Sequence, residues 1–246
     1  MDPRTEVPLT GGHDSGPVVR IGDTVRRGLK PWSTSIHALL QHLERVDFTA
    51  APRFLGLDDH GREILTFIDG ADGRIARCYD DEALIATAKL IKTFHLAVSD
   101  FTPPPGSSWR PNPYAPRGTL ICHNDLGPAN TIFRDGRPQA FIDWDLAVPS
   151  TALWDLSYAV RTFVPLYSDR DCELFGYEPG RRNRRLSLFC DAYGLDRHSR
   201  TELLPTVLDR LESEVTTFAR RCIDALQRHG SQWARAVQTP YVSGTV

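Results

Sequence analysis

The fold is decided by residues 123–145, which read HNDLGPANTIFRDGRPQAFIDWD. Within this stretch an Asp-Gly dipeptide separates two apolar, alternating runs, a pattern typical of a β-hairpin with a tight turn. The hairpin is expected to bring Asn130, before its first strand, close to Asp143, after its second. Asp125 lies five residues before Asn130, in a loop. The sequence therefore predicts one pocket that holds two carboxylates and an amide oxygen.

Oxygen ligands of this kind suit Mg²⁺, which prefers hard donors and commonly shares its coordination sphere with substrate phosphates. The spacing is also informative. A histidine, an aspartate two residues later, an asparagine five residues after that and a further aspartate form the pattern of a kinase catalytic loop and its metal site. The residues that match this pattern are His123, Asp125, Asn130 and Asp143.

The motif resembles the aminoglycoside phosphotransferase and choline-kinase-like branch of the kinase fold, in which residues 142–145 (IDWD) stand where protein kinases have Asp-Phe-Gly. The order of motifs is similar over most of the chain. The resemblance implies an α+β, two-lobed protein-kinase-like fold, with a small antiparallel-sheet N-lobe and a mainly helical C-lobe. Residues 1–70 are expected to form the nucleotide-binding lobe and residues 71–246 the catalytic and acceptor-binding lobe.

The resemblance also implies a reaction, in which the γ-phosphate of ATP or GTP moves to a hydroxyl of a small molecule. Asp125 is expected to be catalytic and to orient and deprotonate that hydroxyl, whereas Asn130 and Asp143 hold Mg²⁺. Backbone near Phe67 and Ile68 is expected to bind the purine edge. An antibiotic is one candidate acceptor, which would give the protein a role in resistance or self-protection.

Three further residues near the motif have expected supporting roles. Asp155 occurs in the segment LWDL (residues 153–156), where an aspartate of the family commonly braces the catalytic loop. His123 is interpreted as a structural residue that hydrogen-bonds loop backbone and takes no part in proton transfer. For Asp145 two interpretations stay open: a second carboxylate on the metal, or a cap for the following loop.

The chain departs from the family at the phosphate anchor, which is a lysine late in the third strand oriented by a glutamate on the next helix. Here the strand ends Val25-Arg26-Arg27, and Ser35, Ile36 and His37 occupy the probable glutamate region. Strand alternation puts Arg26 and Arg27 on opposite faces. Because Val25 is expected to pack under the helix and shares a face with Arg27, we expect Arg26 to bind the phosphates.

The altered anchor keeps a second hypothesis open, that of a catalytically silent kinase-fold binding or immunity protein. The intact Asp125, Asn130 and Asp143 favour the enzyme. A metal-dependent hydrolase is a third hypothesis, but it leaves the strands of the first third of the chain without a role.

Periodicity and turn residues predict the elements outside the motif. Strands are expected at 7–10, 18–21, 24–27, 54–57 and 64–68, and helices from Ser33 or Thr34 and at 80–98, 152–163, 181–193 and 200–229. The glycine-bearing segment 11–16 is either a phosphate-covering loop or a plain turn. Arg181, Arg182, Arg184 and Arg185 are interpreted as the solvated face of a helix start.

Composition narrows the class of protein further. The chain has 246 residues, of which 41% are hydrophobic and 24% charged, as in an ordinary globular domain or two small lobes. A net charge of -2 gives no general reason to bind nucleic acid or an acidic membrane. With no membrane-length apolar run, no export signal and five widely spaced cysteines, a cytoplasmic protein is expected. The acceptor and the oligomeric state are left open.

Overall fold

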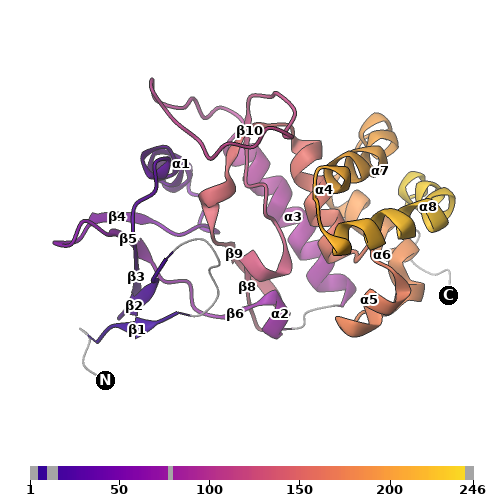
Figure 1. Ribbon diagram of the computed structural model, residues 1–246, viewed down its shortest axis with the longest axis horizontal. Coiled ribbons are helices and arrows are strands. Elements are labelled where there is room, and N and C mark those ends of the chain that lie inside the picture. Colours follow the sequence, from indigo (N-terminus) through magenta and orange to yellow (C-terminus); the bar gives the residue numbers. More distant parts are fainter. Residues whose placement is uncertain (1–4, 10–15, 77–79, 242–246) are drawn as a thin grey trace.

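The computed structural model describes residues 5–9, 16–76 and 80–241, and the segment 11–15 of the glycine-bearing loop lies outside these residues. A sheet with one helix forms one end of the molecule and a group of helices forms the other, with the hairpin of residues 131–141 between them (Figure 1). The predicted α+β, two-lobed architecture is confirmed.

The sheet at the N-terminal end has five antiparallel strands in the order β1-β2-β3-β5-β4. Their bounds are Val7–Pro8 (β1), Val19–Ile21 (β2), Thr24–Arg27 (β3), Phe54–Leu57 (β4) and Glu63–Thr66 (β5). Helix α1 (Ser33–Arg45) follows the third strand, as predicted. Its buried face carries Ile36, Leu39, Leu40 and Leu43, so the i, i+3, i+4, i+7 pattern identified the packed side correctly.

The central part is built on the predicted hairpin of β8 (Thr131–Arg134) and β9 (Arg137–Phe141). Its turn has Asp135 at φ 52° and Gly136 at φ 73°. Positive φ at both central residues is what a two-residue hairpin turn of this twist requires. A short strand, β6 (Ala71–Asp72), extends this sheet beside β8.

The remaining central elements are short. Strands β7 (Leu120–Cys122) and β10 (Val148–Ser150) pair with each other. Helix α2 spans Gly73–Ala76, and the 3₁₀ turns η1 and η2 span Pro128–Asn130 and Trp144–Leu146.

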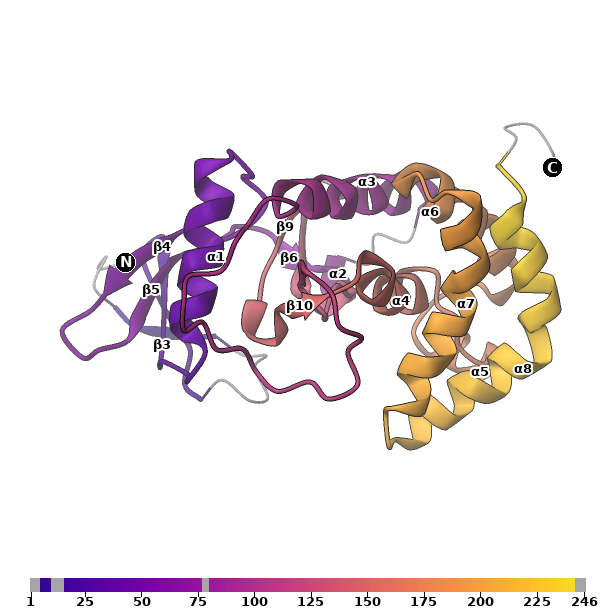
Figure 2. The same cartoon turned by 90° about the horizontal axis from the view of Figure 1, so that it is seen from above.

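Helices make up the C-terminal end. Their bounds are Asp81–Ala97 (α3), Ala152–Phe163 (α4), Asp169–Leu174 (α5), Arg182–Tyr193 (α6), Arg197–Glu212 (α7) and Thr217–Gln238 (α8), with a 3₁₀ turn η3 at Pro179–Arg181. Helix α3 packs on α6, and α7 packs on both α4 and α8 (Figure 2). None of the described helices is long and apolar enough to cross a membrane.

The expectation of one helix over 200–229 is wrong, because the chain turns between α7 and α8. Thr216 is the N-cap of α8, and its hydroxyl accepts a hydrogen bond from the N–H of Ala219. Leu204, Val207 and Leu211 of α7 are buried, but Val215, which lies between the two helices, is 88% exposed. The helix-like spacing of apolar residues continues by coincidence through the turn between α7 and α8, and the capping residue Thr216 marks where the new helix begins.

The interpretation of the four arginines near 181 as a solvated face is wrong for two of them. Arg182 and Arg185 are each only 5% exposed. Arg182 donates to the carbonyl of Tyr167, and Arg185 donates to the carbonyl of Phe163. These guanidinium groups satisfy buried carbonyls at the end of α4 and in the segment after it, a role that charge spacing does not reveal.

The hydrophobic core holds the hairpin against α3. The ring of Phe94 on α3 lies 5.1 Å from that of Trp144 and 6.5 Å from that of Phe141, both in edge-on geometry. All three side chains are almost completely buried. The end of the hairpin that carries the motif is therefore fixed by core packing.

Candidate active site

The catalytic loop follows β7, and α4 holds it through Asp155. One carboxylate oxygen of Asp155 accepts the N–H of His123 at 3.0 Å and the other accepts the N–H of Asn124 at 2.7 Å. Asn124 has φ 65°, a left-handed conformation that these bonds help to maintain. The structure thus places Asp155 where the sequence expected a brace for the loop.

Asp155 is fully buried and ionised. Burial alone would raise its pKa, but the hydrogen bond and charge of His95 and the loop N–H of Asn124 outweigh burial and lower the pKa below its ordinary value. His95 lies 3.1 Å from Asp155 through Nε2 and 2.8 Å from the hydroxyl of Tyr193 through Nδ1. The brace is therefore connected to both α3 and α6.

A second brace was not predicted from the sequence. Arg210 of α7 donates to the carbonyl of Asn124 and, at 3.0 Å, to the carbonyl of Trp154. Its guanidinium lies over the rings of Trp154 and Tyr158. The catalytic loop is consequently held from two helices that are far apart in the sequence.

Asp125 lies at the centre of the site, with its carboxylate held by two neighbours. The amide Nδ2 of Asn130 donates to Asp125 Oδ2 at 2.7 Å and to the Asp125 carbonyl at 3.1 Å. The hydroxyl of Tyr158 forms a hydrogen bond with the same carboxylate, and burial followed by the charge of Asp125 raises the pKa of Tyr158. Tyr158 therefore stays a neutral donor toward Asp125.

The hairpin brings Asn130 and Asp143 together, as predicted. Ile142 donates its N–H to the carbonyl of Asn130 at 2.9 Å. Because Asp143 directly follows Ile142, this bond holds Asp143 close to Asn130. His123 is completely buried, and its Nε2 lies 3.0 Å from the carbonyl of Ile142. This contact with backbone agrees with the structural role expected for His123.

The donor set at this end of the hairpin fits a magnesium ion. Asp143 adopts a left-handed conformation (φ 62°), and its pKa is raised by burial and then by the nearby Asp145. Asp145 Oδ1 is buried without a hydrogen-bond donor among the described residues, although the Nη2 of Arg27 lies 2.9 Å away. Two neighbouring carboxylates beside an amide oxygen are suitable ligands for a hard cation.

No group of three or more His, Cys, Asp or Glu that could hold a metal by itself occurs among residues 5–9, 16–76 and 80–241. A magnesium ion at Asp143 would therefore also need Asn130, water or phosphate oxygens, which is how this ion is commonly bound in phosphoryl-transfer enzymes.

Arg26 was expected to bind the phosphates, but Arg27 is the arginine that the structure places beside Asp143 and Asp145. The Nη1 of Arg27 lies 3.7 Å from Asp143, and its nearest carboxylate is Glu63, which accepts from Nε. The nearest carboxylate to Arg26 is Asp58, 3.8 Å away. Val25 and Arg27 do share a face, but Glu63, the partner of Arg27, contacts His37 of α1, and Arg27 itself contacts Asp145. Packing under α1 therefore does not turn this face away from the aspartates.

The segment expected to bind the purine edge follows β5. Phe67 donates its N–H to the carbonyl of Asp23 at 2.8 Å, and the guanidinium of Arg20 lies 3.7 Å from the centre of its ring. Ile68 packs against the core. The carbonyl of Phe67 and the backbone of Ile68 are therefore the groups of this segment that we expect to hydrogen-bond a purine.

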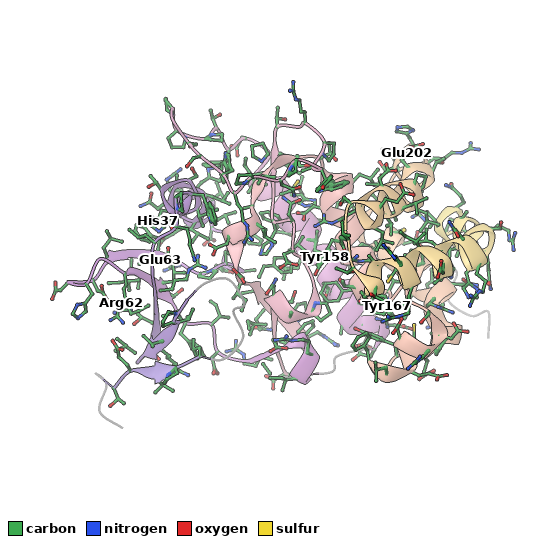
Figure 3. All side chains as sticks on the ribbon, in the orientation of Figure 1. His37, Arg62, Glu63, Tyr158, Tyr167 and Glu202 are labelled. Carbon is green, nitrogen blue, oxygen red and sulfur yellow. The ribbon has the colours of Figure 1, made fainter. Side chains whose placement is uncertain are left out.

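Two residues of the cleft, Glu63 and His37, were missed from the sequence. Glu63 is 1% exposed, pairs with Arg27 and contacts Nε2 of His37 at 2.6 Å. Figure 3 shows His37 and Glu63 in the sheet-bearing end and Tyr158 in the helical end. A polar residue next to a turn at the start of a strand is normally solvated, so the pattern gave no sign of its burial.

A braced loop carries Asp125 and Asn130, a hairpin leads to Asp143, and the guanidinium of Arg27 faces Asp143 and Asp145. Together these features are those of a phosphotransferase site. The chain belongs to the phosphotransferase enzyme family abbreviated APH, whose model matches residues 35–186.

The chain is also similar to a curated protein, the trifolitoxin immunity protein of Rhizobium leguminosarum bv. trifolii. The two are 35% identical over 201 residues, which cover 79% of this chain and 76% of the relative.

Solved structures share the fold at low sequence identity. The amicoumacin kinase hAmiN, in complex with AMP-PNP, Ca²⁺ and Ami, has a TM-score of 0.65 at 12% identity, covering 97% of this chain and 90% of its own. The aminoglycoside phosphotransferase APH(3'')-Id from Streptomyces rimosus has a TM-score of 0.53 at 15% identity, covering 84% and 94%. The predicted membership of this branch of the kinase fold is confirmed.

Proposed function

We propose that the protein is a small-molecule kinase that transfers the γ-phosphate of ATP or GTP to a hydroxyl of its acceptor. The observation that carries this proposal is the convergence of Asp125, Asn130 and Asp143 at one end of a hairpin, on a loop braced by Asp155. Positioning and charge neutralisation supply most of the catalysis of such a transfer. The proposal assigns residues 1–70 to nucleotide binding and residues 71–246 to catalysis and acceptor binding.

Each residue of the site has one role in the proposed transfer. The carboxylate of Asp125 accepts the proton of the acceptor hydroxyl as the oxygen forms a bond to the γ-phosphorus, and the bond from that phosphorus to the bridging oxygen breaks, releasing the nucleoside diphosphate. Asn130 and Asp143, with Asp145 beside them, would hold Mg²⁺, which when bound neutralises phosphate charge. Arg27, in place of the expected Arg26, would bind the phosphates, and backbone at Phe67 and Ile68 the base.

The biological role that we propose is protection against a toxin or antibiotic. Its support is the name of the curated relative, which is an immunity protein, together with antibiotic kinases among the structures of the same fold. A nucleoside triphosphate donor is available in the cytoplasm, where we accordingly expect the protein to act.

A silent binding or immunity protein is the second candidate, and one observation favours it. Arg27 lies close to both Asp143 and Asp145, the carboxylates that a metal would need. If this arrangement persisted with nucleotide present, the protein would sequester its ligand without modifying it.

The proposed function is tested by incubating the protein with γ-³²P-ATP or γ-³²P-GTP, Mg²⁺ and a panel of antibiotics, amino sugars and toxins. We expect label in one acceptor and no transfer by the Asp143→Asn variant. The Asp135→Asn variant, at the opposite end of the same hairpin, is the control and is expected to keep its activity. If the protein binds one or more of these compounds but transfers label to none of them, the silent binding protein is favoured.

A further inference from the structure

Arg27 lies beside the buried Glu63, which in turn contacts the half-buried His37. Arg27 on β3 is the register partner of Glu63 on β5, so the two side chains project from neighbouring positions of one sheet face. Nε of Arg27 donates to Oε1 of Glu63, and Oε2 of Glu63 lies 2.6 Å from Nε2 of His37 on α1. Both oxygens of this buried carboxylate are therefore in use.

The guanidinium of Arg27 is held by a different carboxylate at each nitrogen. Nε contacts Glu63, Nη2 lies 2.9 Å from Asp145, and Nη1 lies 3.7 Å from Asp143. Burial lowers the pKa of Arg27, but the charges of Glu63 and then of the two aspartates outweigh it and raise the pKa. The contact with Glu63 fixes the Nε side of the planar guanidinium, so that Nη1 and Nη2 face Asp143 and Asp145 at the end of the hairpin.

The chemistry of arginine explains why the carboxylate comes from a strand. The charge of a lysine is at the tip of its side chain, within reach of a helix that crosses above the strand. The Nε of an arginine lies partway along the side chain, close to the sheet, and a residue on the neighbouring strand reaches it directly. His37, on the helix, then contacts Glu63 and stacks on Phe54 with ring centres 3.6 Å apart.

We propose that Glu63 is a positioning residue, which orients Arg27 for the nucleotide phosphates, and that His37 positions Glu63. This inference rests on the proposed nucleotide-dependent function. In this protein the anchor pair of the family is rebuilt as Arg27 with a carboxylate from β5, and the position on α1 that lacks a glutamate carries the histidine that supports it. Without Glu63, the guanidinium loses the contact that fixes its Nε side, and its two outer nitrogens are no longer held in one orientation for the phosphates.

The test compares Glu63→Gln with the double variant Glu63→Gln/His37→Glu, which moves the carboxylate from the strand to the helix. Binding of a non-hydrolysable ATP analogue with Mg²⁺ is measured by calorimetry, and KM for ATP is measured separately from kcat. We expect Glu63→Gln to weaken nucleotide binding about tenfold, equivalent to ~1.4 kcal/mol, and the double variant to recover most of it. Glu44→Gln, which changes an exposed carboxylate of the same helix, is the matched control and should bind as the wild type does.

The outcomes separate the inference from the proposed function. The inference alone would be overturned if the wild type binds nucleotide and Glu63→Gln, while still melting cooperatively, binds it with an affinity within twofold of the wild type. A wild-type protein that binds no nucleotide would overturn the proposed function and this inference with it. If Glu63→Gln does not fold, Glu63→Asp keeps the charge but shortens the side chain; weaker nucleotide binding is then expected, and unchanged binding counts against the role.

Discussion

At the scale of single residues, Asp143 combines a strained backbone with an unfavourable charge. Its φ of 62° is uncommon for a residue other than glycine, and burial and the charge of Asp145 raise its pKa. Residues of this kind cost stability and are retained where function needs them. The carboxylate is therefore expected to trade stability for metal binding.

The Asp143→Asn variant should be more stable than the wild type at pH 7 in the absence of metal. Because the folded protein disfavours the ionised carboxyl, the stability that this group contributes is present below its ordinary pKa of about 4 and is lost as the pH rises through the raised value. The difference in stability between Asp143→Asn and the wild type should thus become smaller toward pH 4. Thermal melting of both proteins at pH 7 and at about pH 4 measures this difference, with Asp135→Asn as control.

Adding Mg²⁺ and nucleotide should reverse the order, since the wild type would gain stability from a ligand that the variant binds poorly. A variant that is less stable than the wild type at pH 7 without metal would contradict this account of Asp143.

At the residue scale, the hairpin brings Asn130 close to Asp143 as predicted, because hairpin geometry is a local property. Asp155 contacts the loop where the resemblance to the family implied a brace, and the roles of Asp125, Asn130 and Asp143 stay predictions. Arg27 was not anticipated, because alternation separates two faces of a strand without saying which one lies toward Asp143. Glu63 depends on a contact with a strand distant in the sequence, for which the pattern carries no signal.

At the scale of elements, the catalytic loop is held by both α4 and α7. Asp155 accepts two N–H groups of the loop, and Arg210 donates to the carbonyl of Asn124. The N–H groups of His123 and Asn124 and the carbonyl of Asn124 are thus all hydrogen-bonded. These bonds maintain the left-handed conformation of Asn124. These contacts fix the backbone next to Asp125, the residue that we propose as the catalytic base.

The Arg210→Met variant should lose stability and turnover but keep its nucleotide affinity. The buried carbonyls of Asn124 and Trp154 lose their donor, at a cost of about 1 to 3 kcal/mol. With the loop less ordered we expect kcat to fall about tenfold, while the KM for nucleotide changes little. Urea unfolding and steady-state kinetics provide the two measurements.

Arg220→Met, on an exposed face of α8, is the control for the loss of charge. An Arg210→Met variant with wild-type kcat would show that α7 does not support the catalytic loop.

Element prediction was accurate for β1 to β5, α1, α3 and α4, whose periodicity is regular and whose ends carry caps or turn residues. It failed between α7 and α8, where a single helix was expected. The short α5 was not anticipated, since six residues are too few to show a period. Local pattern thus determined most elements, whereas their packing around the site had to come from the structure.

At the scale of the whole molecule, the sheet end and the helical end face the catalytic loop from two sides (Figure 1). Arg27 reaches the aspartates from the sheet, whereas Tyr158 contacts Asp125 from α4. We therefore propose that the nucleotide binds on the sheet side and the acceptor on the helical side.

Hydrogen exchange should separate these two binding regions. Nucleotide alone is expected to protect amides of β1 to β5 and the segment after β5. Subsequent addition of the acceptor should protect amides after Ala152, in α4 and around the turn between α7 and α8. Acceptor-dependent protection confined to residues before Ile64 would contradict the assignment.

The central claim is that Asp125 is the base of a phosphoryl transfer, and one paired measurement tests it most directly. Transfer of γ-phosphate to the acceptor and the affinity for nucleotide are measured together in the wild type and in Asp125→Asn. We predict that transfer falls at least a hundredfold, with nucleotide affinity nearly unchanged, because the carboxylate acts on the acceptor and on the transition state. Comparable transfer by Asp125→Asn and the wild type, with the true acceptor present, would contradict the account.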